Sequence, residues 1–492
     1  MEIINKNPIG TLIAILKPTP AIDKKTATTS WPELTQPGVV RGSVEKESKM
    51  SIPFTTAIRG NFFDITACVD NPQQLSRQLR HLPDGLILLN EGTIVWFGSW
   101  QQGESLLPPG CEVTHYRDKL IVPGFIDTHI HYPQTEMIGA YGDQLLAWLK
   151  NYTFPTESQF CCEQHSDKMS AFFLQQLLSN GTTTALVFGT VHPQSVEALF
   201  SQAAALNMRL IAGKVMMDRH APDALLETPE ESYQQTRALI ERWHGKQRLS
   251  YAITPRFAPT STPALLAQVQ RLREEFPDAY MHTHLSENLD EVAWVKELFP
   301  DSRSYLDVYH QYGMTGERSV FAHCLHLEEQ EWDCLCQTRS AIAFCPTSNL
   351  FLGSGLFNMQ KAWQKQVKLG IGTDVGAGTT FNMLQTLGEA YKVGQLQHYQ
   401  LSACEAFYHA TLGGARALSL EDKIGNFDIG KEADFVVLDP AVSPLQKLRH
   451  ENSRELAEQL FVLMTLGDDR NVYRTYVDGK VVYRPTTHQE AA

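Results

Sequence analysis

The sequence lacks three features that would place it in a specialised class of protein. It has no run of the ~20 apolar residues that a membrane-spanning helix needs, and its nine cysteines form no paired CxxC motifs. It also lacks an excess of positive charge, because its formal net charge is -13, so it has no general attraction for nucleic acids or anionic lipids. We therefore expect a cytoplasmic protein with reduced thiols, a small-molecule partner, and neither a nucleic-acid nor a membrane partner.

The composition is that of an ordinary globular protein. The chain has 492 residues, of which 43% are hydrophobic and 20% are charged, which excludes a disordered or membrane-embedded class for most of its length. Residues 1–49 differ, because they are rich in Thr, Pro and Lys with little hydrophobic periodicity. We expect them to form a disordered N-terminal extension, and Met50 is an alternative start.

Hairpin signals occur near both ends of the folded region. Alternating apolar residues flank Asn90-Glu91-Gly92 in one segment and Asp478-Gly479 in another, and such dipeptides favour tight turns between strands. The sequence therefore predicts a small β-sandwich domain assembled from residues 50–122 and 425–492.

Residues 123–424 alternate apolar strands with amphipathic helices. Helix-like stretches such as 261–276 and 288–299 separate eight strand candidates. The candidates are GFIDTHIH, TTTALVF, RLIAGKVMM, LSYAITPRF, AYMHTHLS, SVFAHC, AIAFCPTS and VKLGIGTD. This rhythm predicts an α/β fold with a (β/α)8 TIM-like barrel. After the first strand, residues 134–157 are expected to form a long loop over the mouth of the active site.

Polar residues with metal-binding or hydrogen-bonding groups fall at the ends of these predicted strands. They are His129 and His131 at strand one, Arg256 at strand four, His284 at strand five, His323 at strand six and Asp374 at strand eight. Any one of these histidines, taken alone, is more often a packed or surface residue. Because barrel enzymes keep their chemistry at the carboxyl ends of their strands, the joint placement favours an active site.

Three histidines and one aspartate suit a single divalent metal ion. Zinc is the preferred ion, and iron or manganese stay open. Such an ion can lower the pKa of its bound water from ~15.7 to ~7 and supply hydroxide at neutral pH. Glu287, three residues after His284, is then placed to move protons. The alternative for Glu287 is an acid beside Ser286 that favours a helix N-terminus.

Six segments resemble the amidohydrolase superfamily and, within it, the guanine deaminase family. They are PGFIDTHIHYPQ, TPRFAPTST, HTHLSEN, FAHC, CPTSNLFLGSG and GTDVGAGTTFNML. The similarity extends from about Phe63 to the C-terminus. It is most specific in Gln134 after the paired histidines, in TPRF on strand four and in TSN after strand seven.

This resemblance implies a metal site and a catalytic group. His129, His131, His284 and Asp374 would hold one zinc ion, and Glu287 would shuttle protons. Lys214 falls on strand three, whereas the carboxylated lysine of two-metal relatives belongs on strand four, so the chain resembles the one-metal branch.

The resemblance also implies how a substrate is held. His323 would hydrogen-bond the attacked centre or its water, and Asp374 would orient that water next to the substrate. Gln134 and Arg256 would grip the purine edge, since a guanidinium only donates hydrogen bonds and suits a carbonyl such as guanine O6. Phe257 would either stack on the base or belong to the core.

The implied reaction is hydrolysis of guanine to xanthine and ammonia, in which metal-bound hydroxide attacks C2. A homodimer is also implied. Two alternatives remain at this point: a hydrolase of another aminated heterocycle, such as 8-oxoguanine, cytosine or a triazine, and a catalytically inactive barrel used for binding. Base selectivity depends on donors and acceptors in the pocket, which spacing does not reveal.

Overall fold

The computed structural model describes residues 52–142 and 144–485. The predicted extension at residues 1–49 lies outside the described residues. No helix among the described residues is long and apolar enough to cross a bilayer.

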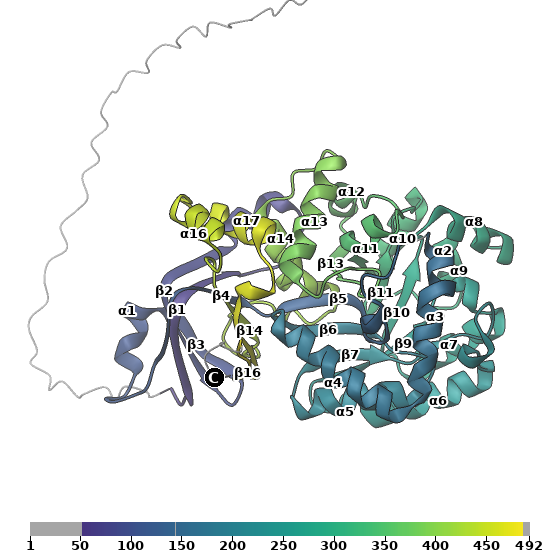
Figure 1. Cartoon of the computed structure of the whole chain (residues 1–492), viewed down its shortest axis with the longest axis horizontal. Helices are drawn as coiled ribbons and strands as arrows, with labels where there is room; N and C mark the ends of the chain where they lie inside the picture. Colours follow the sequence, from purple (N-terminus) through teal and green to yellow (C-terminus); the bar gives the residue numbers. More distant parts are fainter. Residues whose placement is uncertain (1–51, 143, 486–492) are drawn as a thin grey trace, which may run out of the picture. The chain divides into compact units, whose positions relative to one another are not determined.

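Eight parallel strands form the predicted barrel and follow one another in chain order (Figure 1). They are β5 (Phe125–His131), β6 (Thr182–Phe188), β7 (Arg209–Gly213), β9 (Leu249–Pro255), β10 (Tyr280–Leu285), β11 (Ser319–His323), β12 (Ala341–Phe344) and β13 (Lys368–Ile371). The third candidate strand is interrupted at Lys214, and its remainder, β8 (Val215–Met216), pairs with β9. The segment that follows β13 is hydrogen-bonded to the first strand, β5. His131 N donates to Val375 O and Asp374 N donates to His129 O, each at 2.9 Å.

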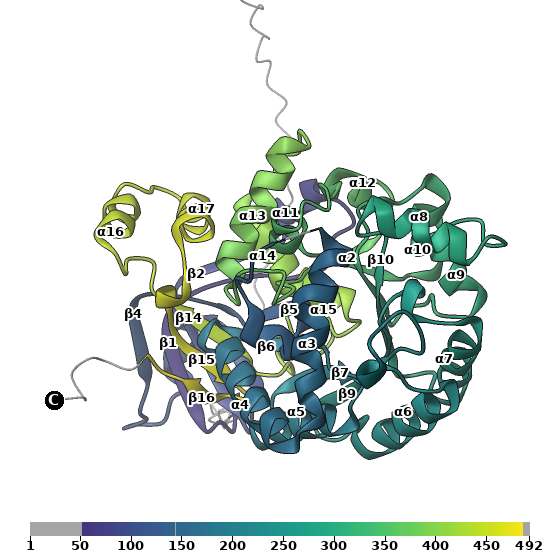
Figure 2. The same cartoon turned by 45° about the vertical axis from the view of Figure 1, so that its right-hand side comes forward.

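Helices surround the barrel strands (Figure 2). They are α4 (Glu163–Ser179), α5 (Pro193–Ala205), α6 (Pro229–Trp243), α7 (Pro263–Glu275), α8 (Leu289–Leu298), α9 (Tyr305–Gln311), α10 (Glu329–Thr338), α11 (Pro346–Phe351), α12 (Met359–Gln364), α13 (Met383–Leu396), α14 (Ala403–Ala410) and α15 (Leu412–Ala417). Helix α7 shows why they form where they do. Thr262 caps it by accepting a hydrogen bond from Leu265 N, and Pro263 occupies its first turn, where a missing N–H costs nothing. Leucines and Val269 at helical spacing bury its inner face.

The end of the barrel opposite the polar strand ends is filled with apolar side chains. Ile126, Leu186, Ile211 and Tyr280 belong to one buried cluster with residues of α15. Because this end is packed, side chains further along the same strands form the floor of a site at the carboxyl end. On β10, side chains two residues apart share a face of the strand. Tyr280, His282 and His284 therefore follow one another on one face, from the apolar end of the barrel toward the site.

The insertion at residues 134–157 is largely helical and is not the loop that the sequence led us to expect. It contains η3 (Tyr132–Met137), α2 (Leu145–Trp148), the π-helical turn η4 (Leu149–Thr153) and α3 (Phe154–Glu157), and η5 (Ser158–Cys161) follows. The reason is visible in the apolar spacing, since Leu145, Trp148 and Leu149 are buried on one face. Pro155 does not break the helix because it lies in the first turn of α3.

The two chain ends build a second sheet of seven strands. Its order is β16 (Lys480–Tyr483), β15 (Val472–Val477), β14 (Phe435–Leu438), β4 (Thr114–Pro123), β1 (Thr56–Ile65), β2 (Leu79–Asn90) and β3 (Thr93–Ser99). Both predicted hairpins are present. Their turns use left-handed φ values at Glu91-Gly92 (46° and 79°) and Asp478-Gly479 (52° and 71°), as tight two-residue hairpins require.

These seven strands are hydrogen-bonded into one sheet that curls over a shared core, which accounts for the sandwich-like pattern. Ile94 N donates to Lys431 O at 2.9 Å and Gly430 N donates to Ile94 O at 2.8 Å, so β3 meets the segment before β14. Phe62 and Phe435, from different parts of the sheet, belong to the same buried cluster.

Smaller elements complete the described chain. They are α1 (Trp100–Gly103), α16 (Pro444–Glu451), α17 (Leu456–Leu466), and the 3-10 turns η1 (Pro72–Arg77), η2 (Glu104–Leu106), η6 (Asp223–Leu225), η7 (Ala258–Thr260) and η8 (Asp469–Asn471). We propose that the barrel comprises residues 123–424 and that residues 50–122 and 425–492 form the small domain.

A buried ion-pair network links the barrel to the second sheet. Arg248, directly before β9, donates to Glu432 (Nε to Oε2, 2.9 Å) and to Asp434 (Nη1 to Oδ1, 3.1 Å). Arg248 is 8% exposed and Asp434 is 7% exposed. Because each charge is removed from water, each depends on its partner.

We predict that Arg248→Ala lowers the free energy of unfolding by about 3 to 5 kcal/mol, because it leaves Asp434 buried without its partner. Urea unfolding measures this change. Arg237→Ala is the matched control, since Arg237 is 45% exposed and pairs with Glu241 at the surface, where a change within about 0.5 kcal/mol is expected. Equal effects of the two substitutions would contradict the structural role of the network.

Candidate active site

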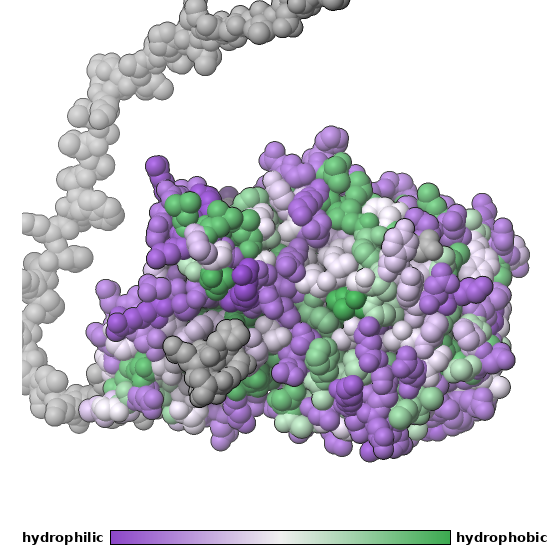
Figure 3. Space-filling model, viewed as in Figure 1, coloured by the Kyte–Doolittle hydropathy of each residue, from purple (hydrophilic) through white to green (hydrophobic). Residues whose placement is uncertain are grey.

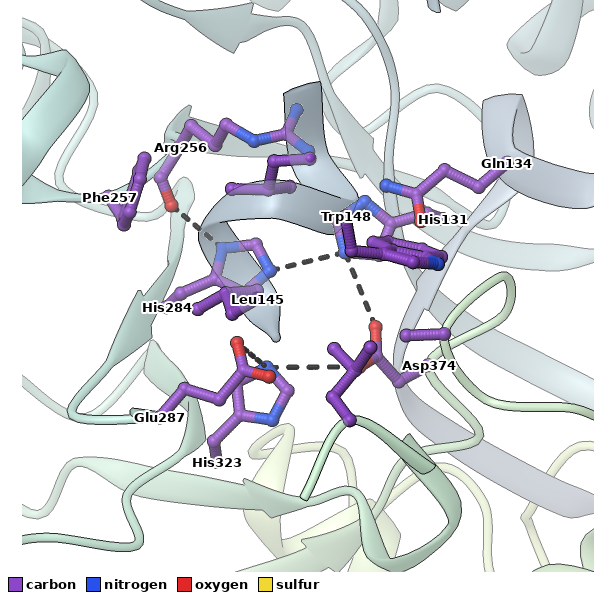
Figure 4. Close-up of a pocket in the computed structure, with 13 residues that line it drawn as sticks. His131, Gln134, Leu145, Trp148, Arg256, Phe257, His284, Glu287, His323 and Asp374 are labelled. Atoms are coloured by element: carbon purple, nitrogen blue, oxygen red, sulfur yellow. Dashed lines mark hydrogen bonds and ion pairs between the residues drawn. The ribbon is translucent and has the colours of Figure 1, made fainter. Parts of the chain in front are cut away.

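The four predicted metal ligands meet at the carboxyl end of the barrel. His131 Nε2 lies 3.2 Å from His129 Nε2 and 3.2 Å from His284 Nε2. Asp374 Oδ1 lies 3.2 Å from His129 Nε2 and 3.4 Å from His131 Nε2. Side chains from β5, from β10 and from the residues after β13 thus point their donor atoms at one position (Figure 4).

The tautomers of these histidines favour metal binding. His284 Nδ1 lies 2.8 Å from Arg256 O, and because a carbonyl only accepts, the proton is on Nδ1 and the Nε2 lone pair is free. His129 Nδ1 lies 2.8 Å from His282 Nε2, so the buried His282, two residues before His284 on β10, supports the ring of His129.

Burial also keeps the histidines neutral. It lowers the pKa of His129 to about 3 and the pKa values of His131 and His284 well below the usual range. Three neutral imidazoles that turn lone pairs toward one another and toward a carboxylate repel each other unless a cation lies among them. The donor set therefore fits one divalent ion, and nitrogen and oxygen donors of this kind suit zinc.

A second grouping of possible ligands includes Cys345 with His129, His323 and Asp374. The thiol is a poor candidate, because burial raises the pKa of Cys345 well above its usual range and a metal needs the thiolate. Its Sγ instead lies 3.5 Å from Ala343 O. We favour the set with His131 and His284, which leaves Cys345 in a structural role.

Glu287 and His323 lie beside the ligand cluster. Glu287 Oε2 is 3.4 Å from His323 Nε2, and Ser354 Oγ donates to Glu287 Oε1 at 3.2 Å. Burial, followed by the charge of Asp374, raises the pKa of Glu287 well above the usual range of a carboxyl group. A carboxyl group with a raised pKa holds a proton more readily than an ordinary one, which suits a group that first accepts and then releases a proton.

His323 is oriented as a hydrogen-bond donor. Asn349 Nδ2 donates to His323 Nδ1 at 2.9 Å, so the proton of the neutral ring is on Nε2. That buried nitrogen has no hydrogen-bond partner among the described residues, and it lies 3.8 Å from Asp374 Oδ2. The N–H group is thus available to a molecule bound in the pocket.

Two of these residues adopt an unusual backbone conformation. His323 has φ 72° and Asp374 has φ 51°, in the left-handed region that costs side-chain-bearing residues on the order of 1 to 3 kcal/mol. The cost is tolerated where the surrounding fold over-determines the position. Asp127 contributes here, because its carboxylate accepts hydrogen bonds from Thr373 N at 3.1 Å and Thr373 Oγ1 at 2.5 Å.

The pocket above the cluster has polar groups at one side and apolar walls. Its polar lining includes Gln134 and Arg256, and its apolar walls are Leu145, Trp148, Leu149, Phe257, Leu352 and Ala377. All the predicted substrate-contact residues therefore line one cavity (Figure 4).

Glu157 joins two polar residues of the pocket lining, Gln134 and Arg256. Its Oε1 accepts from Gln134 Nε2 at 3.1 Å, and its Oε2 accepts from Arg256 Nη1 at 2.7 Å. The sequence analysis did not identify Glu157. The sequence signal for Glu157 is an acidic residue at helical spacing among apolar residues. This signal was missed because residues 134–157 were expected to form a loop.

Lys214 takes no part in the cluster. Its Nζ is buried and pairs with Glu227 at 2.5 Å. This arrangement agrees with a site for one metal ion.

The chain is similar in sequence to a known protein family and to known enzymes. The model of the amidohydrolase family matches residues 120–482. Guanine deaminase of Escherichia coli (strain K12) is 66% identical over 427 residues, covering 87% of this chain and 97% of the relative.

The fold is also similar to solved structures of guanine deaminases. That of E. coli guanine deaminase matches with a TM-score of 0.87 at 65% identity, covering 88% of this chain and 100% of the other. The structure of guanine deaminase from C. acetobutylicum with guanine bound in its active site matches with a TM-score of 0.79 at 30% identity, covering 87% and 100% of the two chains.

Proposed function

The chain belongs to the amidohydrolase family, and on that premise we propose that its barrel hydrolyses guanine to xanthine and ammonia. In this reaction water adds to C2, the bond from C2 to the 2-amino nitrogen breaks, and ammonia leaves. The observation that carries this conclusion is that three of the proposed metal ligands, Glu287, Gln134 and Arg256 all line one cavity. The guanine deaminase relatives named above support the choice of guanine.

His129, His131, His284 and Asp374 would hold the metal ion. A divalent ion in this position activates water as a nucleophile at neutral pH. We propose zinc, because three imidazole nitrogens and one carboxylate oxygen are typical zinc donors that leave room for a further ligand.

The acid–base steps are assigned to residues of the chain. Glu287 removes a proton from the attacking water and delivers it to the purine ring or to the departing amino group. His323 donates a hydrogen bond from Nε2 to the attacked centre or its water, and Asp374 orients that water. The distance of 3.4 Å between Glu287 Oε2 and His323 Nε2 supports their action on one reacting group.

The purine is held at the edge that lies away from the reacting C2 atom. Arg256 and Gln134 bind the side of the base that carries O6, and Arg256 donates to that carbonyl oxygen. Phe257, which is 4% exposed and lines the pocket, packs against the base. These assignments favour guanine over cytosine or a triazine, which do not present the same edge.

The function is tested by xanthine and ammonia formation from a panel of bases. Guanine should give the highest kcat/KM, and 8-oxoguanine, cytosine, adenine and a triazine should give lower values. A higher kcat/KM with one of the other bases would replace guanine as the substrate while keeping the hydrolytic chemistry. No activity with any of them would favour the inactive barrel.

We predict that Arg256→Ala raises the KM for guanine and lowers kcat/KM by roughly 10²-fold, the equivalent of losing a buried charged partner. The loss has two parts, because the carbonyl contact disappears and Glu157 is left buried without its cation. Steady-state kinetics measures it. Arg242→Ala is the control, since Arg242 is 62% exposed and contacts Glu197 at the surface. An unchanged kcat/KM would exclude the contact.

We also propose a cytoplasmic homodimer. Leu445 and Leu448 on α16 are each 56% exposed, and Leu466 on α17 is 39% exposed. Figure 3 shows an apolar area over α16 and α17, which a second copy of the chain would cover. Light scattering in solution tests this, and a monomeric mass would exclude the dimer.

A further inference from the structure

We infer that Glu157 is a positioning residue that sets the direction of both purine-binding side chains and thereby favours a purine with a carbonyl at that edge. The inference deepens the proposed function and rests on it. Glu157 comes from α3, in the helical insertion after the first barrel strand, and touches none of the metal-binding side chains among the contacts described above.

The Glu157 carboxylate forms a bridge between the two side chains. One oxygen accepts from Gln134 and the other from Arg256, at 3.1 and 2.7 Å. Glu157 is 0% exposed, and Gln134 and Arg256 are each 2% exposed. A buried carboxylate that uses both oxygens on two different side chains fixes their separation as well as their directions.

Glu157 also sets the orientation of the Gln134 amide. Gly376 N donates to Gln134 Oε1 at 3.3 Å, while Nε2 donates to Glu157. Because an N–H group only donates and a carboxylate only accepts, these two partners permit one orientation of the amide. Without Glu157 the amide would lose the contact that holds its donor end.

Two residues of α3 lie beside the Arg256 guanidinium. The guanidinium carbon lies 5.5 Å from the centroid of the Phe154 ring, and Glu157 is one helical turn further along the same element. Residues three apart on a helix share a face. The aromatic ring therefore lies within cation–π distance of the guanidinium, and the carboxylate limits its rotation.

Fixing the Arg256 side chain makes the pocket prefer a substrate with a hydrogen-bond acceptor at this position. The guanidinium makes a single hydrogen bond to a described residue, through Nη1 to Glu157, and its other N–H groups are donors beside the pocket. Donors held in fixed directions bind a carbonyl oxygen and oppose an amino group at the same position. Glu157 thus acts on substrate choice through Arg256 and Gln134, without touching the substrate.

The test is Glu157→Gln, which keeps the size of the side chain and removes its charge. We expect the KM for guanine to rise and kcat/KM to fall on the order of 10²-fold, as for a misplaced binding group, while kcat changes by less than about 5-fold and metal content stays the same. Glu163→Gln, in the first turn of α4 on the exposed surface, is the matched control and should match the unsubstituted protein.

Two further variants separate positioning from a general structural role. In an Arg256→Ala background, Glu157→Gln should lower kcat/KM by less than about 5-fold, because Arg256, one of the two side chains through which Glu157 acts, is gone and only the contact with Gln134 is left to lose. If Glu157→Gln does not fold, Glu157→Asp keeps the charge with a shorter reach and is expected to fold with an intermediate KM.

The outcomes distinguish this inference from the proposed function. An unchanged KM for Glu157→Gln, a loss of kcat together with metal, or full additivity with Arg256→Ala would overturn the inference while guanine deamination stands. No ammonia from guanine with the unsubstituted protein would overturn the proposed function and this inference with it.

Discussion

Replacing Glu287 with glutamine is expected to lower the turnover of guanine by about 10²- to 10⁴-fold, the usual contribution of a general acid–base group. The amide keeps the size of the side chain, yet it cannot take a proton from water or return one to the purine. Glu287 lies outside the proposed ligand set, so the variant should keep its metal ion. Single-turnover ammonia release and elemental analysis of the same preparation measure both properties.

A matched control is available on the following helix. Glu297 is exposed on α8, and Glu297→Gln should leave turnover unchanged. Near-normal turnover by Glu287→Gln with full metal occupancy would remove Glu287 from the mechanism. Loss of metal together with turnover would instead make it part of the metal site.

Removing the metal ion is expected to lower ammonia release by at least about 10³-fold, since the ion supplies several kcal/mol of stabilisation to the charge that develops during attack. Treatment with a chelator followed by dialysis produces the metal-free protein. Activity should return when Zn²⁺ is added back. Full activity without any divalent ion would contradict the assigned role of the cluster.

Substitution of a ligand tests the same site without a chelator. His131→Asn should reduce metal content and activity together, because His131 Nε2 lies within 3.4 Å of three other proposed ligand atoms. His398→Asn is the control, since His398 is exposed and its left-handed φ of 57° is tolerated by asparagine. Retention of metal by His131→Asn would remove it from the ligand set.

The barrel could be predicted because strands that are buried on both faces are apolar along their whole length. A run such as Thr182–Phe188 is apolar or β-branched nearly throughout, which is typical of a parallel strand covered by helices. Turn dipeptides such as Asp478-Gly479 likewise mark hairpins by local chemistry alone. The helical insertion was mistaken for a loop because α2, η4 and α3 are each only one turn long, and their stability comes from packing.

The candidate site was predictable to the extent that each residue ends a strand. His129, His284 and Asp374 follow from that rule, because the barrel brings strand ends together. Glu157 does not follow from it. Its partner Arg256 is 99 residues away in the sequence, and only the folded insertion brings the two charges together. The orientation of the His323 ring by Asn349 is a contact of the same kind.

Metal content by elemental analysis and ammonia release from guanine can be measured on one preparation of the whole chain. We expect one divalent ion per chain, bound by three histidines and one aspartate, and equal amounts of ammonia and xanthine formed from guanine. A preparation that binds no metal and releases no ammonia would exclude both the metal site and the proposed reaction.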